Sequence, residues 1–233
     1  MSGTLYGVGL GPGDPELMTV KAIKTIEHCD VIALPISSTE GKVAWEIALE
    51  MVPKIEEKEI LSLSMPMTRD KRLLEESHQQ AAEKITAHLA KNQSVAFLTI
   101  GDPSIYSTYC YLHELVAKHY SVQMIAGVPS FCAVAAELNI PLGQGAQMIH
   151  IVPASYQGWE ESLDYAGTKI LMKAGKAIDQ IKERLKDKQC LVDVMMVERC
   201  GMADEMIYKG IDAIDELANY LSTIIVKEKG ERR

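Results

Sequence analysis

Two turns rich in glycine and proline, each directly after an apolar run, constrain the fold of this chain most. The first overlaps the end of the apolar run of residues 5–10 and reads Gly-Leu-Gly-Pro-Gly-Asp-Pro over residues 9–15. The second follows residues 95–100 and begins Gly101-Asp102-Pro103. Each turn leads into a segment with helical spacing of apolar residues, and the order strand, turn, helix is typical of parallel α/β sheets. Because ligands bind such sheets at the carboxyl ends of strands, both turns are candidate parts of a binding site.

The residues of the first turn disfavour a phosphate-binding loop. Proline has no backbone N–H, so Pro12 and Pro15 remove donors that a bound phosphate would need. Pro12 also occupies the place of the last glycine in the dinucleotide-binding pattern Gly-x-Gly-x-x-Gly, and Asp30 precedes the second expected strand instead of following it. A ligand without phosphates, held by its shape, fits this turn better.

Composition excludes several classes of protein. With 233 residues, 47% of them hydrophobic and 24% charged, the chain has enough apolar material for a sizeable core. No apolar run reaches the roughly 20 residues of a membrane span and no signal pattern opens the chain, so we expect a cytoplasmic protein with no membrane partner. The net charge of −8 disfavours a nucleic-acid partner. The five cysteines are far apart and the histidines lack metal-ligand spacing, so we expect reduced thiols and no metal site.

Strand-like and helix-like segments alternate along the chain, which predicts an α/β fold in two halves. The expected strands are residues 5–10, 31–34, 95–100, 122–125, 149–152, 169–172, 191–198 and 222–226. The expected helices are residues 19–28, 43–51, 71–91, 106–118, 130–138, 177–185 and 211–220, and residues 53–70 are expected to be irregular. The first half should form a parallel sheet. No Ser/Gly-rich linker is present, so the two predicted domains, residues 1–126 and 127–233, meet at a tight boundary.

One carboxylate and three basic residues follow expected strands. The Asp102 carboxylate could accept hydrogen bonds from a ribose or orient a cationic group; alternatively Asp102 or Ser104 could cap a helix. Lys173, Lys176 and Arg199 could contact an acidic substrate or be solvated. Both interpretations stay open for each group.

Taken in chain order, these segments resemble the tetrapyrrole methyltransferase family. The similar segments cover nearly the whole chain and are residues 7–19, 101–109, 127–131, 140–142, 172–175, 197–199 and 220–226. The resemblance implies two α/β domains of the class III methyltransferase fold, S-adenosylmethionine in the cleft between them, and a homodimer. It assigns to the cofactor Leu10, Pro12, Gly101, Asp102, Pro103, Ile105, Tyr106, Pro129, Ser130, Phe131, Met172, Cys200 and Thr223. S-adenosylmethionine has no phosphate, which agrees with a turn poor in N–H donors.

Within the family, residues 101–109 and Ser130-Phe131 are most similar to the methyltransferases that act on C-20 of precorrin-2 or cobalt-factor II in cobalamin biosynthesis. In the implied reaction, an electron-rich meso carbon of the tetrapyrrole takes the sulfonium methyl group and then loses a proton. The candidate general bases are Asp102, Tyr220 and Lys176. The candidate partners of the substrate carboxylates are Lys173, Lys176 and Arg199.

Three alternatives remain. A uroporphyrinogen-III methyltransferase would differ in the carbon that receives the methyl group. A diphthine synthase would share the fold and methylate a protein. A nucleotide-binding module without activity would need phosphate contacts, which the first turn disfavours.

Overall fold

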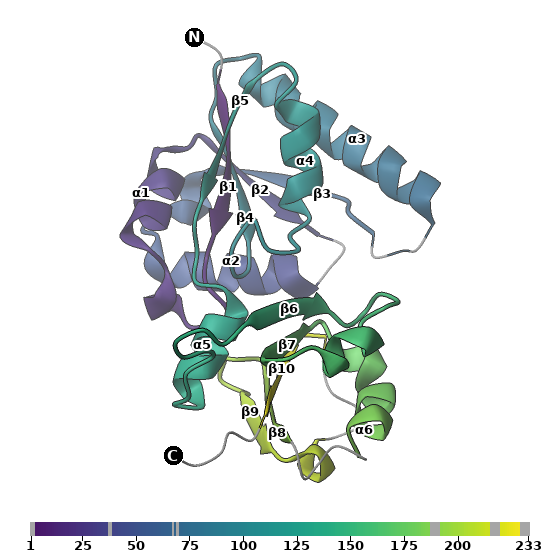
Figure 1. The fold of residues 1–233 in the computed structure, drawn as a ribbon. Coiled ribbons are helices and arrows are strands. Elements are labelled where there is room, and N and C mark those ends of the chain that lie inside the picture. Colours follow the sequence, from purple (N-terminus) through teal and green to yellow (C-terminus); the bar gives the residue numbers. More distant parts are fainter. Residues whose placement is uncertain are drawn as a thin grey trace. The chain divides into compact units, whose positions relative to one another are not determined.

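The chain forms two compact units, Met1–Pro129 and Ser130–Arg233 (Figure 1). The structure is a computed structural model, and it describes residues 3–36, 39–66, 68, 70–186, 192–214 and 220–228, apart from the side chains of Thr39 and Lys176. A five-stranded sheet forms the centre of each unit. Within the described residues, no helix combines the length and the apolar character that crossing a membrane requires.

The sheet of the first unit is parallel throughout, as predicted, and its strand order is β3-β2-β4-β1-β5. Its strands are β1 (Thr4–Gly9), β2 (Val31–Pro35), β3 (Glu59–Leu63), β4 (Val95–Thr99) and β5 (Ser121–Ile125). Its helices are α1 (Val20–His28), α2 (Thr39–Met51), α3 (Lys71–Leu89) and α4 (Tyr109–Val116), with short 3-10 turns at Pro15–Leu17 and Ile55–Glu57.

Helices cover both faces of this sheet: α1 and α2 lie on one face, and α3 and α4 on the other (Figure 1).

Short polar side chains cap the N-termini of two helices. The Thr19 hydroxyl accepts the N–H of Ala22, and the Asp70 carboxylate accepts the N–H groups of Arg72 and Leu73. The apolar face of α3 packs into the core beside α4 and the sheet, where Ile85 and Phe97 are buried.

Strand β3 corrects the expectation that residues 53–70 are irregular. It is the edge strand next to β2, and of its five residues only Leu63 is buried. Ile60 is exposed, so the alternation of apolar and polar residues that identifies a half-buried strand is weak. Sheet pairing with β2, rather than a local pattern, makes this segment a strand.

The second unit has a mixed sheet of order β6-β7-β10-β8-β9. Its strands are β6 (Ile149–Pro153), β7 (Thr168–Met172), β8 (Val192–Glu198), β9 (Met206–Lys209) and β10 (Ser222–Glu228). Its helices are α5 (Ser130–Glu137) and α6 (Ile178–Lys186), with 3-10 turns at Glu160–Asp164, Gly175–Ala177 and Ile211–Ala213. Only β6 and β7 are parallel; β10 runs antiparallel to both β7 and β8, and β9 antiparallel to β8.

Two features of the second unit were not predicted. Strand β9 is short, lies at the sheet edge and exposes Met206 and Ile207, so it carries little periodic signal. The last strand, β10, inserts between β7 and β8, which places its first residues beside the last residues of two earlier strands. Of the helix expected at residues 211–220, residues 215–219 lie outside the described part of the chain, as do Cys190 and Leu191.

Candidate functional site

The turns after β1, β4 and β5 lie together at the carboxyl edge of the first sheet. Strand β1 pairs with β4 on one side and β5 on the other, with Gly9 opposite Thr99 and Val8 opposite Ile125. Beyond the strands, Gly101 donates its N–H to the Gly11 carbonyl at 2.7 Å, and Gly11 donates to the Gly101 carbonyl at 3.3 Å. The two turns singled out in the sequence are therefore in direct backbone contact.

The backbone of these turns approaches so closely that side chains are excluded. A β-carbon on Gly9 would lie 2.6 Å from the carbonyl oxygen of Gly101 and 2.7 Å from the nitrogen of Gly127. A β-carbon on Gly127 would lie 2.1 Å from the same Gly101 oxygen. Glycine is required at these positions because any side chain would displace backbone atoms.

Asp102 connects the turn after β4 to the turn after β5. Its Oδ2 accepts the backbone N–H of Gly127 at 3.0 Å, and its Oδ1 accepts the backbone N–H of Ser104 at 2.8 Å and also the Ser104 hydroxyl. Helix α4 begins only at Tyr109, later than predicted, with Thr108 at its N-cap. Capping of this helix by Asp102 or Ser104, one of the two interpretations left open, is therefore wrong.

The remainder of the Gly101 turn is fixed to β4 and α4. The hydroxyl groups of Thr99 and Ser107 are hydrogen bonded at 2.9 Å, Ser107 also accepts the N–H of Tyr109, and the Cys110 thiol donates to the Pro103 carbonyl. These contacts fix the turn to β4 and α4.

The other positions that the resemblance assigns to the cofactor in this unit differ in exposure. Leu10, Pro12, Gly101 and Pro103 are buried, Ile105 and Pro129 are half-buried, and Tyr106 is 41% exposed. Tyr106 has a left-handed backbone with φ of 49°, a conformation that costs a non-glycine residue free energy and is often found at functional sites. Partial burial raises the pKa of its hydroxyl above the ordinary value.

A second cluster lies in the second unit, where β7 and β8 end and β10 begins. Thr223 is opposite Met172 on one side and Val197 on the other, and its hydroxyl lies 3.4 Å from that of Ser130, the first residue of α5. Cys200 is buried and Phe131 is half-buried. The start of β10 thus lies beside β7, β8 and α5, and the Ser130–Thr223 contact joins residues 93 positions apart in the chain.

The basic residues of this cluster have partners within the unit. The Lys173 ammonium lies 5.2 Å from the centre of the Tyr220 ring, a cation–π distance. Arg199 donates its Nε to Asp204 and its backbone N–H to the Leu221 carbonyl. Lys173 and Arg199 both have left-handed backbones, with φ of 57° and 53°. The side chain of Lys176 lies outside the described part of the structure, although its backbone belongs to the Gly175–Ala177 turn.

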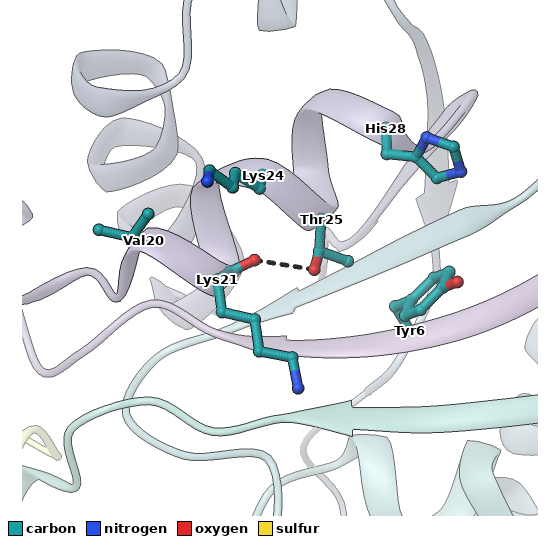
Figure 2. Close-up of a pocket in the computed structure, with 6 residues that line it drawn as sticks. All are labelled: Tyr6, Val20, Lys21, Lys24, Thr25 and His28. Carbon is teal, nitrogen blue, oxygen red and sulfur yellow. Dashed lines mark hydrogen bonds between the residues drawn. The ribbon is translucent and has the colours of Figure 1, made fainter.

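A separate hollow of about 400 Å³ lies on α1 and β1 (Figure 2). It is lined by Tyr6, Val20, Lys21, Lys24, Thr25 and His28. None of the residues predicted to bind cofactor or substrate lines it, and the Thr25 hydroxyl donates to the Lys21 carbonyl one helical turn earlier. Across the described ranges, no three metal-binding side chains are grouped closely enough to hold an ion.

Comparison with known proteins identifies the class. Residues 4–213 match the sequence model of the Tetrapyrrole (Corrin/Porphyrin) Methylases, and the chain belongs to this family. It is an S-adenosylmethionine-dependent C-methyltransferase.

Two curated relatives and one solved structure define the similarity further. The chain is 35% identical to a probable cobalt-precorrin-2 C(20)-methyltransferase of Methanocaldococcus jannaschii, over 96% of this chain and 95% of the relative. It is 31% identical, with the same coverage, to a precorrin-2 C(20)-methyltransferase of a Sinorhizobium species. The fold matches that of a uroporphyrin-III C-methyl transferase from Thermus thermophilus, complexed with S-adenyl homocysteine, with a TM-score of 0.72, 20% identity and 97% coverage of both chains.

Proposed function

We propose that this protein transfers a methyl group from S-adenosylmethionine to C-20 of precorrin-2, or of its cobalt-containing counterpart, in cobalamin biosynthesis. The observation that carries the proposal is the similarity over nearly the full length to two relatives whose names specify C(20) of that substrate. A uroporphyrinogen-III methyltransferase shares the fold, but fold similarity at 20% identity does not select a substrate.

The turns of the first unit suit the proposed cofactor. S-adenosylmethionine supplies an electrophilic methyl group on a sulfonium and carries no phosphate. The turn after β1 contains Pro12 and Pro15, which lack N–H donors. The cofactor contacts that we propose in this unit are those that the resemblance implies, namely Leu10, Pro12, Gly101, Asp102, Pro103, Ile105, Tyr106 and Pro129. The second-unit positions that the resemblance adds, Ser130, Phe131, Met172, Cys200 and Thr223, remain predictions.

The contribution of the chain to the chemistry is mainly positioning. Methyl transfer is an in-line displacement, and holding the acceptor carbon in line with the methyl group removes a large part of the barrier. The acceptor carbon then loses its proton, and a base helps that step. Both Asp102 oxygens accept hydrogen bonds from donors of the protein itself, so of the three candidate bases Tyr220 and Lys176 remain for this step.

We further propose that Lys173 and Arg199 bind substrate carboxylates. Both follow the ends of strands that flank the start of β10. The Arg199 side chain is 26% exposed and that of its partner Asp204 is 62% exposed, so the Asp204 side of the pair is open to solvent.

The test is a methyl-transfer assay with isotopically labelled S-adenosylmethionine. Metal-free precorrin-2 and the cobalt form are each incubated with the protein, and product mass and the labelled carbon are determined. One added methyl at C-20 is the expected result. The form that is methylated faster shows whether cobalt is already in the ring when the protein acts. A methyl group on another carbon, or no transfer to either substrate by cofactor-bound protein, would refute the assignment.

The homodimer implied by the resemblance is part of the proposal. Light scattering on the purified protein should give twice the chain mass of 25.7 kDa. A monomer that transfers methyl groups at full rate would show that dimerisation is not needed. The cytoplasmic location expected from the sequence likewise stays a prediction.

A further inference from the structure

A hydrogen bond to Asp102 connects the turn after β5 to the turn after β4, and the Thr19 hydroxyl also donates to the Ala126 carbonyl of the first of these turns. Strands β4 and β5 are not neighbours, because β1 lies between them, and β5 is the edge strand next to β1. The sheet ladder therefore does not connect their turns directly. The hydrogen bond from the Gly127 N–H to Asp102 Oδ2 spans this gap, at the place where Gly9 has no side chain.

The Asp102 carboxylate acts purely as an acceptor in this arrangement. Its Oδ1 takes both donors of Ser104, and its Oδ2 takes the Gly127 N–H. An ionised carboxylate accepts at both oxygens, whereas an asparagine amide offers one acceptor oxygen and one donor NH₂ group. Either orientation of that amide would therefore leave an N–H facing an NH₂.

We propose that Asp102 is a positioning residue, which holds the turn of residues 126–129 against the Gly101 turn and thereby shapes the cofactor site, and that it does not remove the substrate proton. The part that concerns the cofactor rests on the proposed function. The hydrogen bond that carries the inference does not.

The experiment compares Asp102→Ala and Asp102→Asn with a matched control, Asp30→Asn. Asp30 Oδ2 accepts the N–H of Ser94 at 2.8 Å, just before β2 and β4, so it makes the same kind of bond at the opposite edge of the same sheet. Amide hydrogen exchange of Gly127 and Ser94 is followed by NMR. Loss of a hydrogen bond to a charged group should accelerate Gly127 exchange about 10- to 100-fold in Asp102→Ala. In the Asp30→Asn control the amide oxygen can still accept the Ser94 N–H, so exchange of Ser94 should accelerate less than exchange of Gly127 does in Asp102→Ala, and Gly127 should be unchanged.

Steady-state kinetics separate positioning from base catalysis. We expect Asp102→Ala to raise the KM for S-adenosylmethionine about 10-fold or more, with partial recovery in Asp102→Asn and a pH–rate profile of unchanged shape. Asp30→Asn should leave this KM unchanged even if it lowers the melting temperature.

Three results would overturn the proposal. The first is unchanged Gly127 exchange in Asp102→Ala. The second is a large loss of kcat in Asp102→Asn with normal KM, the signature of a lost base. The third is accelerated Gly127 exchange in Asp102→Ala together with an unchanged KM for S-adenosylmethionine. If the unmodified protein neither bound S-adenosylmethionine nor transferred methyl groups, the proposed function would fail, and so would the role of Asp102 in shaping the cofactor site. Gly127 exchange would still test whether Asp102 holds the turn of residues 126–129.

Discussion

The ring of Tyr109 occupies the space where a side chain of Gly7 would be. A β-carbon on Gly7, in the middle of β1, would lie 2.3 Å from Cε1 and 2.4 Å from Cζ of that ring. The Tyr109 hydroxyl donates to the Gln123 carbonyl of β5 at 3.0 Å, so the first residue of α4 packs on one strand and hydrogen bonds to the next. This fully buried contact fixes the start of α4 and with it the end of the Gly101 turn.

Gly7→Ala should therefore destabilise the first unit. Overpacking of this kind costs about 1–3 kcal/mol of unfolding free energy, because ring and strand must separate. Urea denaturation of Gly7→Ala, Tyr109→Leu and the double variant measures the effect. Since leucine frees the space of the ring, the double variant should lose less unfolding free energy than the two single variants lose together. Additive losses would show that the ring is not the obstacle.

The buried thiol of Cys29 should make stability fall at alkaline pH. Burial raises the pKa of Cys29 from 9.0 to about 12, against an opposing effect of the Lys58 ammonium. Above pH 9 the unfolded thiol ionises while the folded thiol stays neutral, so the folded state loses up to about 1.4 kcal/mol per pH unit until about pH 12. Below pH 9 the thiol has no effect.

Denaturation from pH 8 to 11 tests this linkage. In Cys29→Ala the free energy of unfolding should fall less steeply with pH. Loss of the side chain itself lowers the stability by the same amount at every pH. Cys132→Ala is the control, because Cys132 is exposed and should alter the slope less. Equal slopes for the unmodified protein and Cys29→Ala would contradict the prediction.

Arg199→Ala and Lys173→Ala should weaken substrate binding. Loss of one charge-assisted contact with a substrate carboxylate should raise the substrate KM on the order of 10-fold and make it less dependent on salt. Lys209→Ala, which removes an exposed charge from β9, is the matched control and should change neither quantity. Unchanged KM and salt dependence in both site variants would remove these residues from the substrate site.

Tyr220→Phe should separate the hydroxyl of Tyr220 from its ring. Phenylalanine keeps a ring for the Lys173 ammonium but has no ionisable group. If the hydroxyl is the base, kcat should fall on the order of 10²-fold while the substrate KM changes little. Full activity of Tyr220→Phe, with loss in Tyr220→Leu, would instead assign the residue to holding Lys173.

Local patterns predicted most of the elements of the first unit. The apolar runs that became β1, β2 and β4, and the periodic segments that became α1 and α3, have structural bounds within a few residues of the expected ones. They were predictable because their burial is strongly one-sided or complete. Edge strands β3 and β9 were missed because they are half-exposed, and α4 starts later than expected because the contacts of Ser107 and Tyr109 shape the preceding turn.

The chain sequence by itself determined that glycine-rich turns follow apolar strands, that the first turn is poor in N–H donors, and that the ordered motifs resemble one family. The tertiary structure decided which turns meet. Strand order places β1 between β4 and β5, which brings Gly9, Gly101 and Gly127 into contact and gives the Asp102 carboxylate its partner 25 residues later. It also inserts β10 between β7 and β8, so that Thr223 lies beside Met172. Neighbours of this kind follow from long-range pairing of backbone groups, which the spacing of side chains along the chain does not encode.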